Sequence, residues 1–243
     1  MLEMLLSAES WAALLKIIGI NIVLSGDNAV VIALACRSLP VKQRKMGVLF
    51  GSAGAIVLRI ILTFFAVYLM NLSYLKIVGA LLLLWIGVKL ILPEDSHGES
   101  ISANDNLIAA IRTIIIADFV MSLDNVIGVA AAANGNVPLI VIGLLISIPI
   151  IIFGSTLIMK VMDRFPIIIT IGGGLLGYVA GEMAVTDSAI AGWIEHHAHY
   201  LHTWLPIIGA VFVVALGKWL ASRHENTSAP LVDLAANEAT GKH

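Results

Sequence analysis

Long continuous runs of apolar residues dominate the chain, and polar residues gather in the stretches between them. A bilayer core of about 30 Å requires roughly 20 apolar residues in helical conformation. The runs do not alternate between apolar and polar positions, which argues against membrane-spanning strands. We therefore predict an all-α polytopic membrane protein with seven transmembrane helices, at about residues 11–35, 46–70, 72–92, 108–133, 137–161, 166–184 and 204–221.

The composition agrees with a membrane protein and narrows the function. Of the 243 residues, 59% are hydrophobic and only 12% are charged, against about 25% charged in a soluble domain. A net charge of −2 makes nucleic acid an unexpected partner. The single cysteine, Cys36, excludes an intrachain disulfide and a thiolate metal cluster. We expect one transmembrane domain over 1–221 and a disordered cytoplasmic tail over 222–243.

The basic residues are distributed unevenly between the two sides of the membrane. Cytoplasmic loops are enriched in Lys and Arg. If the N-terminus is outside and the C-terminus is cytoplasmic, ten basic residues fall on the cytoplasmic side and two, Lys16 and Lys76, fall outside. We therefore expect a multi-pass protein of the bacterial inner (plasma) membrane in this orientation. The ten residues are Arg37, Lys42, Arg44, Lys45, Lys89, Arg112, Lys160, Arg164, Lys218 and Arg223.

Two apolar segments share the same polar positions. Residues 15–35 resemble residues 112–132 with an offset of 97 residues. The second copy begins three helices after the first, so it should be inverted in the membrane, as in many secondary transporters. This predicts a 3+3 inverted-topology repeat, with repeat A over about 11–92, repeat B over about 108–184, and a seventh helix outside it. The matched pairs are Asn21 with Asp118, Ser25 with Ser122, Asp27 with Asp124, and Asn28 with Asn125.

The duplicated acids are expected near the membrane midplane. A carboxylate there costs roughly 2.5–3.5 kcal/mol on insertion scales, so residues of this kind usually serve a function. Carboxylate and amide oxygens are the ligands that hard divalent cations such as Mg²⁺, Mn²⁺ and Ca²⁺ prefer. The competing interpretation is that they only hydrogen-bond the helices together. The candidate metal ligands are Asp27, Asn28, Asp124, Asn125 and Asp118, with Asn21, Ser25 and Ser122 as further polar positions.

Three more residues bear on this site. Arg59 lies in the middle of the second predicted helix, where we expect an ion pair with Asp118 or a position lining a water-filled cavity. Met121 could offer a thioether that favours Mn²⁺, although packing is the simpler interpretation. Glu182 could be an exit-path ligand, a proton carrier or a solvated helix end.

Two further features of the sequence complete the candidates, a set of glycines and a loop rich in histidine. The glycines of the sixth predicted helix are spaced for close helix packing, and they are Gly173, Gly177 and Gly181. A loop on the outer face is rich in histidine and could collect or release a metal ion, or could simply be polar. Its candidate residues are Glu195, His196, His197, His199 and His202.

The segments SGDNAVV (25–31) and SLDNV (122–126) resemble the TerC family, in its YjbE-like branch, within the LysE superfamily. The resemblance implies a bacterial protein of seven membrane helices that exports Mn²⁺ from the cytoplasm. It also implies that acidic residues bind the metal, here Asp27 and Asp124, with Asp118 as the upstream acid of the second copy. The chain departs from the family pattern at Asn21, where an acidic residue is common.

The sequence thus favours a secondary transporter that exports a hard divalent cation, with Mn²⁺ as substrate and no resident cofactor, and not an enzyme. Moving a dication out of an inside-negative cell costs about 4.6 kcal/mol per 100 mV, and the chain contains no P-loop. We therefore expect proton antiport through Asp118 or Glu182. The alternatives are an amino-acid exporter of the LysE type, with Arg59 as its cationic group, an intramembrane aspartyl protease, and a scaffold without transport. A homo-oligomer is left open.

Overall fold

The computed structural model describes residues 15, 18–19, 26–70, 72–92, 103–132 and 137–227. These residues form helices and no strands, so the predicted all-α class is confirmed for this part of the chain. The helices are α3 (Gly26–Cys36), α4 (Val41–Met70), α5 (Leu75–Ile91), α6 (Ala103–Ala132), α7 (Val137–Arg164), α8 (Ile167–Val185), α9 (Ala191–His197) and α10 (Leu201–Thr227).

Five of these helices, α4, α6, α7, α8 and α10, are long and apolar enough to cross a membrane. The shorter ones are α3, with 11 residues, and α5, with 17 residues. At 1.5 Å per residue α5 is about 26 Å long, slightly less than the thickness of a bilayer core. Twelve of the 25 residues of the first expected span, 11–35, lie outside the described residues. The five candidate spans support a polytopic protein, and the count of seven stays a prediction.

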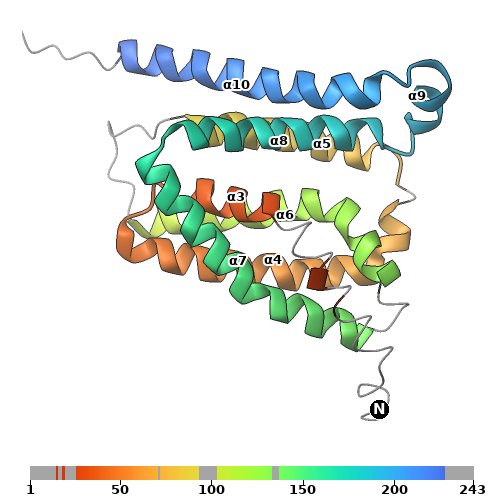
Figure 1. The fold of residues 1–243 in the computed structure, drawn as a ribbon, viewed down its shortest axis with the longest axis horizontal. Coiled ribbons are helices and arrows are strands. Elements are labelled where there is room, and N and C mark those ends of the chain that lie inside the picture. Colours follow the sequence, from red (N-terminus) through yellow and green to blue (C-terminus); the bar gives the residue numbers. More distant parts are fainter. Residues whose placement is uncertain are drawn as a thin grey trace, which may run out of the picture.

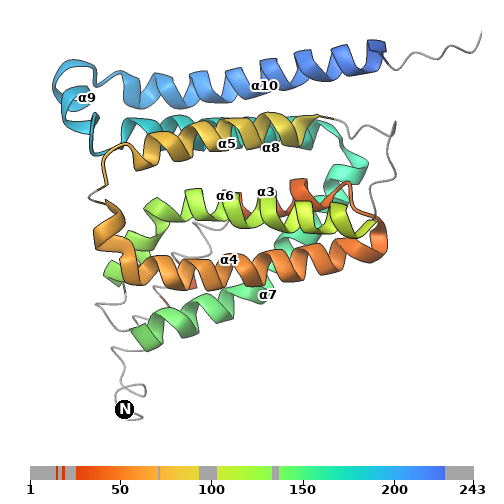
Figure 2. The ribbon, with the colours of Figure 1, turned by 180° about the vertical axis from the view of Figure 1, so that it is seen from behind.

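The helices are arranged in two layers, shown from opposite sides in Figures 1 and 2. One layer contains α5, α8 and α10, in which α8 packs extensively on both of the others. The other contains α3, α4, α6 and α7, in which α4 packs extensively on α6 and α3 packs on α7. The main apolar core includes buried side chains of both layers, such as Leu34, Leu83, Ile114 and Leu176.

Two polar contacts tie helix ends together at one end of the molecule, which we call the basic end. Arg37 Nη2, just after α3, donates to the carbonyl oxygen of Leu92 at 3.0 Å. Arg44 Nη1, at the start of α4, lies 2.8 Å from Asp163 Oδ2 near the end of α7. Arg37 and Arg44 are both among the basic residues expected on the cytoplasmic side, and each contact joins one of them to the end of another helix.

At the opposite end, Asp187 connects α8 to the beginning of α5. Its carboxylate accepts the backbone N–H groups of Tyr74 (3.0 Å), Lys76 (3.0 Å), Ile77 (3.3 Å) and Ala189 (2.8 Å). The first amides of a helix have no partner within the helix, so this side chain caps α5. Asp187 is completely buried. Burial alone would raise the pKa of its carboxyl, but the four N–H donors outweigh burial and hold the pKa below its usual value.

Exposed aromatic side chains lie near both ends of the helices, as is usual at the two surfaces of a membrane. At the basic end, Lys89 Nζ lies 5.3 Å from the ring centroid of Trp85, and the Arg223 guanidinium lies 4.1 Å from that of Trp219. The exposed aromatic residues at the opposite end include Tyr74, Trp193, Tyr200 and Trp204. This arrangement agrees with helices that cross a bilayer.

Several helix boundaries differ from the prediction. Helix α4 begins at Val41 and α6 at Ala103, each five residues before its expected start. The stretch 185–203, expected as a linker, contains the short helix α9. Helix α10 continues to Thr227, six residues past its expected end at 221. The residues after 221 include neither Gly nor Pro, which would favour a helix end, until Pro230. The first part of the expected tail is therefore helical, and residues 228–243 lie outside the described residues.

Glycines allow α8 and α10 to approach at backbone distance. A Cβ added at Gly177 would overlap the carbonyl oxygen of Gly209, and one added at Gly181 would overlap that of Leu205. Gly173 faces α5, where a Cβ would overlap the side chain of Ile91. The close packing predicted for these three glycines is thus confirmed.

Candidate functional site

A buried ion pair between α4 and α6 is the centre of the candidate site. Arg59 Nη2 lies 2.6 Å from Asp118 Oδ1, as expected from the sequence. Ser122 bridges the two groups: its Oγ accepts from Arg59 Nε at 3.0 Å and donates to Asp118 Oδ2 at 3.1 Å. The exposed fractions are 2% for Arg59, 6% for Asp118 and 0% for Ser122. Both carboxylate oxygens of Asp118 are therefore already engaged within the protein.

Small residues on α4 bring Arg59 close to α6. A Cβ at Gly51 would lie 2.5 Å from Ile114 Cδ1, and one at Gly54 would lie 2.8 Å from Ile115 Cδ1. The two helices can therefore pack closely at these positions. Ile114 precedes Asp118 by one helical turn, so the close packing directs Arg59, further along α4, toward the acid. The sequence analysis did not connect these glycines with Arg59.

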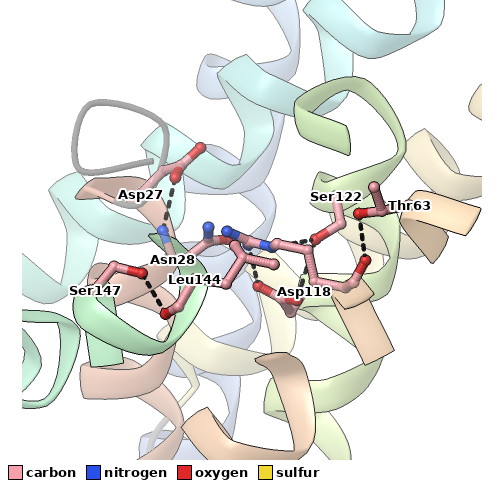
Figure 3. Close-up of polar contacts among 8 residues, drawn as sticks. Asp27, Asn28, Thr63, Asp118, Ser122, Leu144 and Ser147 are labelled. Atoms are coloured by element: carbon pink, nitrogen blue, oxygen red, sulfur yellow. Dashed lines mark hydrogen bonds and ion pairs between the residues drawn. The ribbon is translucent and has the colours of Figure 1, made fainter. Parts of the chain in front are cut away.

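The first Asp-Asn motif lies beside this ion pair, at the beginning of α3 (Figure 3). Asp27 Oδ1 accepts the backbone N–H of Asn28 at 2.7 Å. Asp27 is partly buried and Asn28 is 4% exposed. Asp27 also interacts electrostatically with both Arg59 and Asp118. A carboxylate in the first turn of a helix is favoured by the positive end of the helix dipole.

A small cavity connects the motif to the ion pair. It is lined by Asn28, Val31 and Ile32 of α3 and by Ile114 and Asp118 of α6. The two repeated positions Asn28 and Asp118 therefore line one space, although 90 residues separate them in the sequence. This is the contact between the two motif-bearing helices that a shared site requires.

Helix α7 contributes a polar position that the sequence analysis missed. Ser147 is completely buried and donates from Oγ to the carbonyl oxygen of Leu144 at 2.7 Å. Figure 3 shows Ser147 on the side of Asn28 away from Ser122. Two residues later, Pro149 lies inside α7, and it cannot donate to the carbonyl four residues earlier. A serine followed two residues later by a proline in an apolar helix is the sequence signal that could have identified this position.

The remaining predicted residues are distributed as follows. Asn125 is buried on α6 with 8% exposure, and Met121, with 4%, is part of the apolar core, which agrees with packing. Asp124 belongs to α6, but its side chain lies outside the described part of the structure. Glu182 is exposed on α8, in the layer that does not contain the ion pair. Asn21 and Ser25 lie outside the described residues.

A larger cavity of about 240 Å³ opens at the basic end. It continues along the same boundary between α3 and α6, one turn away from the small cavity, and its polar lining includes Arg37, Lys89, Asn106 and Thr113. The two basic side chains repel a cation, so this cavity is not itself a cation-binding site. The sequence analysis did not single it out, because its residues come from three separate helices.

The charges of the described groups at the site do not balance. Among the described charged groups, the carboxylates of Asp27 and Asp118 face a single guanidinium, that of Arg59, which leaves one negative charge. Charged groups are costly in a membrane unless they are paired or functional. The pairing of Arg59 with Asp118 accounts for two of the three charges, and Asp27 is the one that a ligand could compensate.

The fold and the site together define a polytopic integral membrane protein with a buried polar centre between two repeated motifs. Comparison with known proteins agrees, because residues 6–225 match the "Integral membrane protein TerC family". The chain belongs to this family.

Individual relatives are membrane proteins too. The chain is 45% identical over 202 residues to "Uncharacterized membrane protein YjbE" of Bacillus subtilis, covering 83% of this chain and 92% of the relative. It is 26% identical to "Uncharacterized membrane protein YkoY" of the same organism, covering 90% and 74%. It is also 26% identical to "UPF0053 inner membrane protein YgdQ" of Escherichia coli, covering 65% and 73%. No solved structure matches the chain.

Proposed function

We propose that this protein is a secondary transporter that exports a hard divalent cation, with Mn²⁺ as the substrate we favour. The observation that carries the proposal is the buried cluster of Asp27, Asn28, Arg59 and Asp118, which has an excess of negative charge inside a bundle of apolar helices. Carboxylate and amide oxygens suit a hard dication such as Mn²⁺.

The ligand set follows from which oxygens are engaged. Asp27 and Asn28 supply the oxygens of the first motif, and Asp124 and Asn125 supply those of the second. Asp118 is held by Arg59 and Ser122, so it joins the ligands only in a state in which Arg59 has moved away. Arg59 then acts as an internal substitute for the cation when no ion is bound.

The packing of the helices supports an inverted repeat. The repeat pairs α3 with α6, α4 with α7, and α5 with α8. If each helix is exchanged for its counterpart, the contact of α4 with α6 becomes that of α7 with α3, and the contact of α5 with α6 becomes that of α8 with α3. All four contacts are present. Three others, α3 with α6, α4 with α7 and α5 with α8, map onto themselves, whereas the smaller contacts of α3 with α4 and of α7 with α8 have no counterpart of comparable extent.

We propose that the N-terminus is outside and that the basic end lies in the cytoplasm, because cytoplasmic loops are enriched in Lys and Arg. The Escherichia coli relative is named an inner membrane protein, and we propose the same membrane here. Export of a dication against an inside-negative potential needs a coupling ion, for which we propose the proton. Asp118 is the better proton carrier, because it belongs to the cluster, whereas Glu182 is exposed on the other layer.

Two of the three alternative functions, amino-acid export and proteolysis, fit the site less well. An amino-acid exporter needs a cationic partner for the substrate carboxylate, and the Arg59 guanidinium is bound by Asp118 and Ser122. An aspartyl protease needs two carboxyl groups tuned as acid and base, and Asp118 is committed to an ion pair. We therefore propose transport and not catalysis.

The test is Mn²⁺ flux in liposomes containing the purified full chain. The wild type should export Mn²⁺, and an imposed pH gradient should accelerate the flux. Asp27→Asn and Asp124→Asn should each lower the rate by tenfold or more, because each removes a ligand charge. Asp163→Asn is the matched control, since it removes an exposed carboxylate at the basic end. Full activity of both motif variants, or a wild type that does not move Mn²⁺, would refute the proposal.

A further inference from the structure

The turn between α9 and α10 brings three potential metal ligands together. Glu195 lies on α9, His199 in the turn and His202 in the first turn of α10. Their ligand atoms all lie within 4.8 Å of one another. The geometry points to a second metal site, built from Glu195, His199 and His202, for a borderline divalent ion such as Zn²⁺ or Co²⁺. This inference does not rest on the proposed transport function.

The distances suit coordination better than direct hydrogen bonds. His199 Nδ1 and His202 Nε2 both lie 3.5 Å from the same oxygen, Glu195 Oε2. An N–H···O hydrogen bond is usually 2.7–3.2 Å long. Two ligands about 2.1 Å from a tetrahedral metal ion are about 3.4 Å apart. These two separations match two edges of such a tetrahedron, and the ligand atoms of all three residues lie within 4.8 Å of one another.

The backbone holds the three ligand-bearing positions close together before any ion binds. Ala198 N donates to the carbonyl oxygen of Ile194 at 2.9 Å, and Leu201 N donates to that of Ala198 at 2.8 Å. Ile194 and Ala198 are buried, with 2% and 3% exposure, so the turn is anchored to the rest of the fold. A ligand set held in place by its scaffold loses less entropy on binding.

The other two histidines of the loop do not join the cluster. The ring of His197 stacks on Trp193, with centroids 5.7 Å apart and an angle of 14° between the planes. His197 Nδ1 also lies 3.2 Å from the carbonyl oxygen of Trp193. His196 is exposed and is outside the group whose ligand atoms converge. His196 and His197 are therefore matched controls on the same helix.

The donor types select the ion. Two imidazoles and one carboxylate bind borderline metals such as Zn²⁺, Co²⁺ and Ni²⁺ and bind Mn²⁺ more weakly, following the Irving–Williams order. Three protein ligands leave a fourth position for water. This chemistry differs from the all-oxygen set proposed around Asp27. The site also lies at the end of the molecule opposite the basic end, since Asp187 directly precedes α9.

The experiment uses the full-length protein in detergent micelles, freed of metal with a chelator and titrated with Co²⁺ as a visible-absorption probe. The wild type should show the absorption bands of tetrahedral Co²⁺, which Zn²⁺ in turn displaces. His199→Ala, His202→Ala and Glu195→Gln should each lower the Co²⁺ affinity by tenfold or more.

The controls separate this site from other carboxylates of the protein and from general disturbance of the loop. His196→Ala, His197→Ala and Asp163→Asn should retain the bands and the affinity. Unchanged Co²⁺ binding in both His199→Ala and His202→Ala would overturn the inference, as would an equal loss in His196→Ala. Melting curves of each variant show whether a loss of binding is accompanied by unfolding. Because the readout is binding, it stands whether or not the protein transports Mn²⁺.

Discussion

Arg59 on α4 and Asp118 on α6 form an ion pair in which Nη2 and Oδ1 lie 2.6 Å apart, with both side chains buried. The hydroxyl of Ser122 contacts both groups. The pair therefore has partners for its remaining polar atoms, which is the condition under which buried charges are tolerated. The pair also joins α4, which carries Arg59, to α6, which carries the second motif.

Removal of one charge of this pair should cost more than removal of both. Arg59→Met leaves Asp118 buried and uncompensated, so we expect a loss of about 3–5 kcal/mol of stability. The double variant Arg59→Met/Asp118→Leu should recover most of that loss. Unfolding of Arg59→Met, Asp118→Leu and the double variant in micelles measures the coupling free energy between the two side chains. Additive effects of the two substitutions would contradict the pairing.

Ser122 should be needed for the geometry of the pair rather than for its charge. Ser122→Ala removes two hydrogen bonds but leaves the ionic contact, so we expect a smaller cost of about 1–3 kcal/mol. The proposed Mn²⁺ flux should fall but not disappear. Ser222, an exposed serine that bonds to its own helix, offers Ser222→Ala as a control with little expected effect. Equal stability of the Ser122→Ala variant and the wild type would rule out the bridging role.

Asp187 should make stability depend on pH in the acid range. Its pKa is lower in the folded protein than the usual value of about 3.9 for an aspartate. The stabilisation of the fold by the Asp187 carboxylate is therefore complete above about pH 4. It is lost as the pH falls through the pKa of Asp187 in the folded protein. Asp187→Asn should lower stability at neutral pH by about 1–3 kcal/mol and reduce the loss on acidification. Thermal unfolding at several pH values measures both effects.

The control for Asp187 is Asp163→Asn at the other end of the molecule. The Asp163 side chain is 53% exposed, and exposed ion pairs contribute about 0–1 kcal/mol. If both variants were equally stable at neutral pH, the capping role of Asp187 would be wrong.

Close packing of α8 on α10 should be sensitive to a single methyl group. Gly177→Ala places a Cβ on the backbone of Gly209, which cannot move aside as a side chain can. We expect a loss of about 1–3 kcal/mol. In Gly154→Ala the new Cβ meets only Ala29 Cβ, at 3.9 Å, so the helix should accept it. A Gly177→Ala variant that melts with the wild type would show that the two backbones are further apart than described.

Periodicity and the cost of buried charge were sufficient to predict much of this protein. Continuous apolar runs indicated the helices, and the position of Arg59 in such a run indicated its pairing with Asp118, because few groups can neutralise a guanidinium at that depth. Glycine spacing likewise predicted the tight contacts of Gly173, Gly177 and Gly181.

Contacts between distant segments were beyond the sequence pattern. Asp187 follows an apolar helix and looks like a solvated helix end, yet it caps a helix that begins 112 residues earlier. In the same way, four histidines in one loop look equivalent, and only the turn at Ala198 separates His199 and His202 from the other two. Such differences depend on the path of the backbone in three dimensions, which local propensity does not encode.

The glycine contact of α10 with α8 has a mechanical consequence. Two helices whose backbones touch cannot slide or separate without losing that contact, so they behave as one rigid unit. Any movement of α8 during the proposed transport cycle would carry the last helix with it. The turn that holds Glu195 and His199 would then shift in step with α8, which would make a metal ion or label attached there a reporter of the motion.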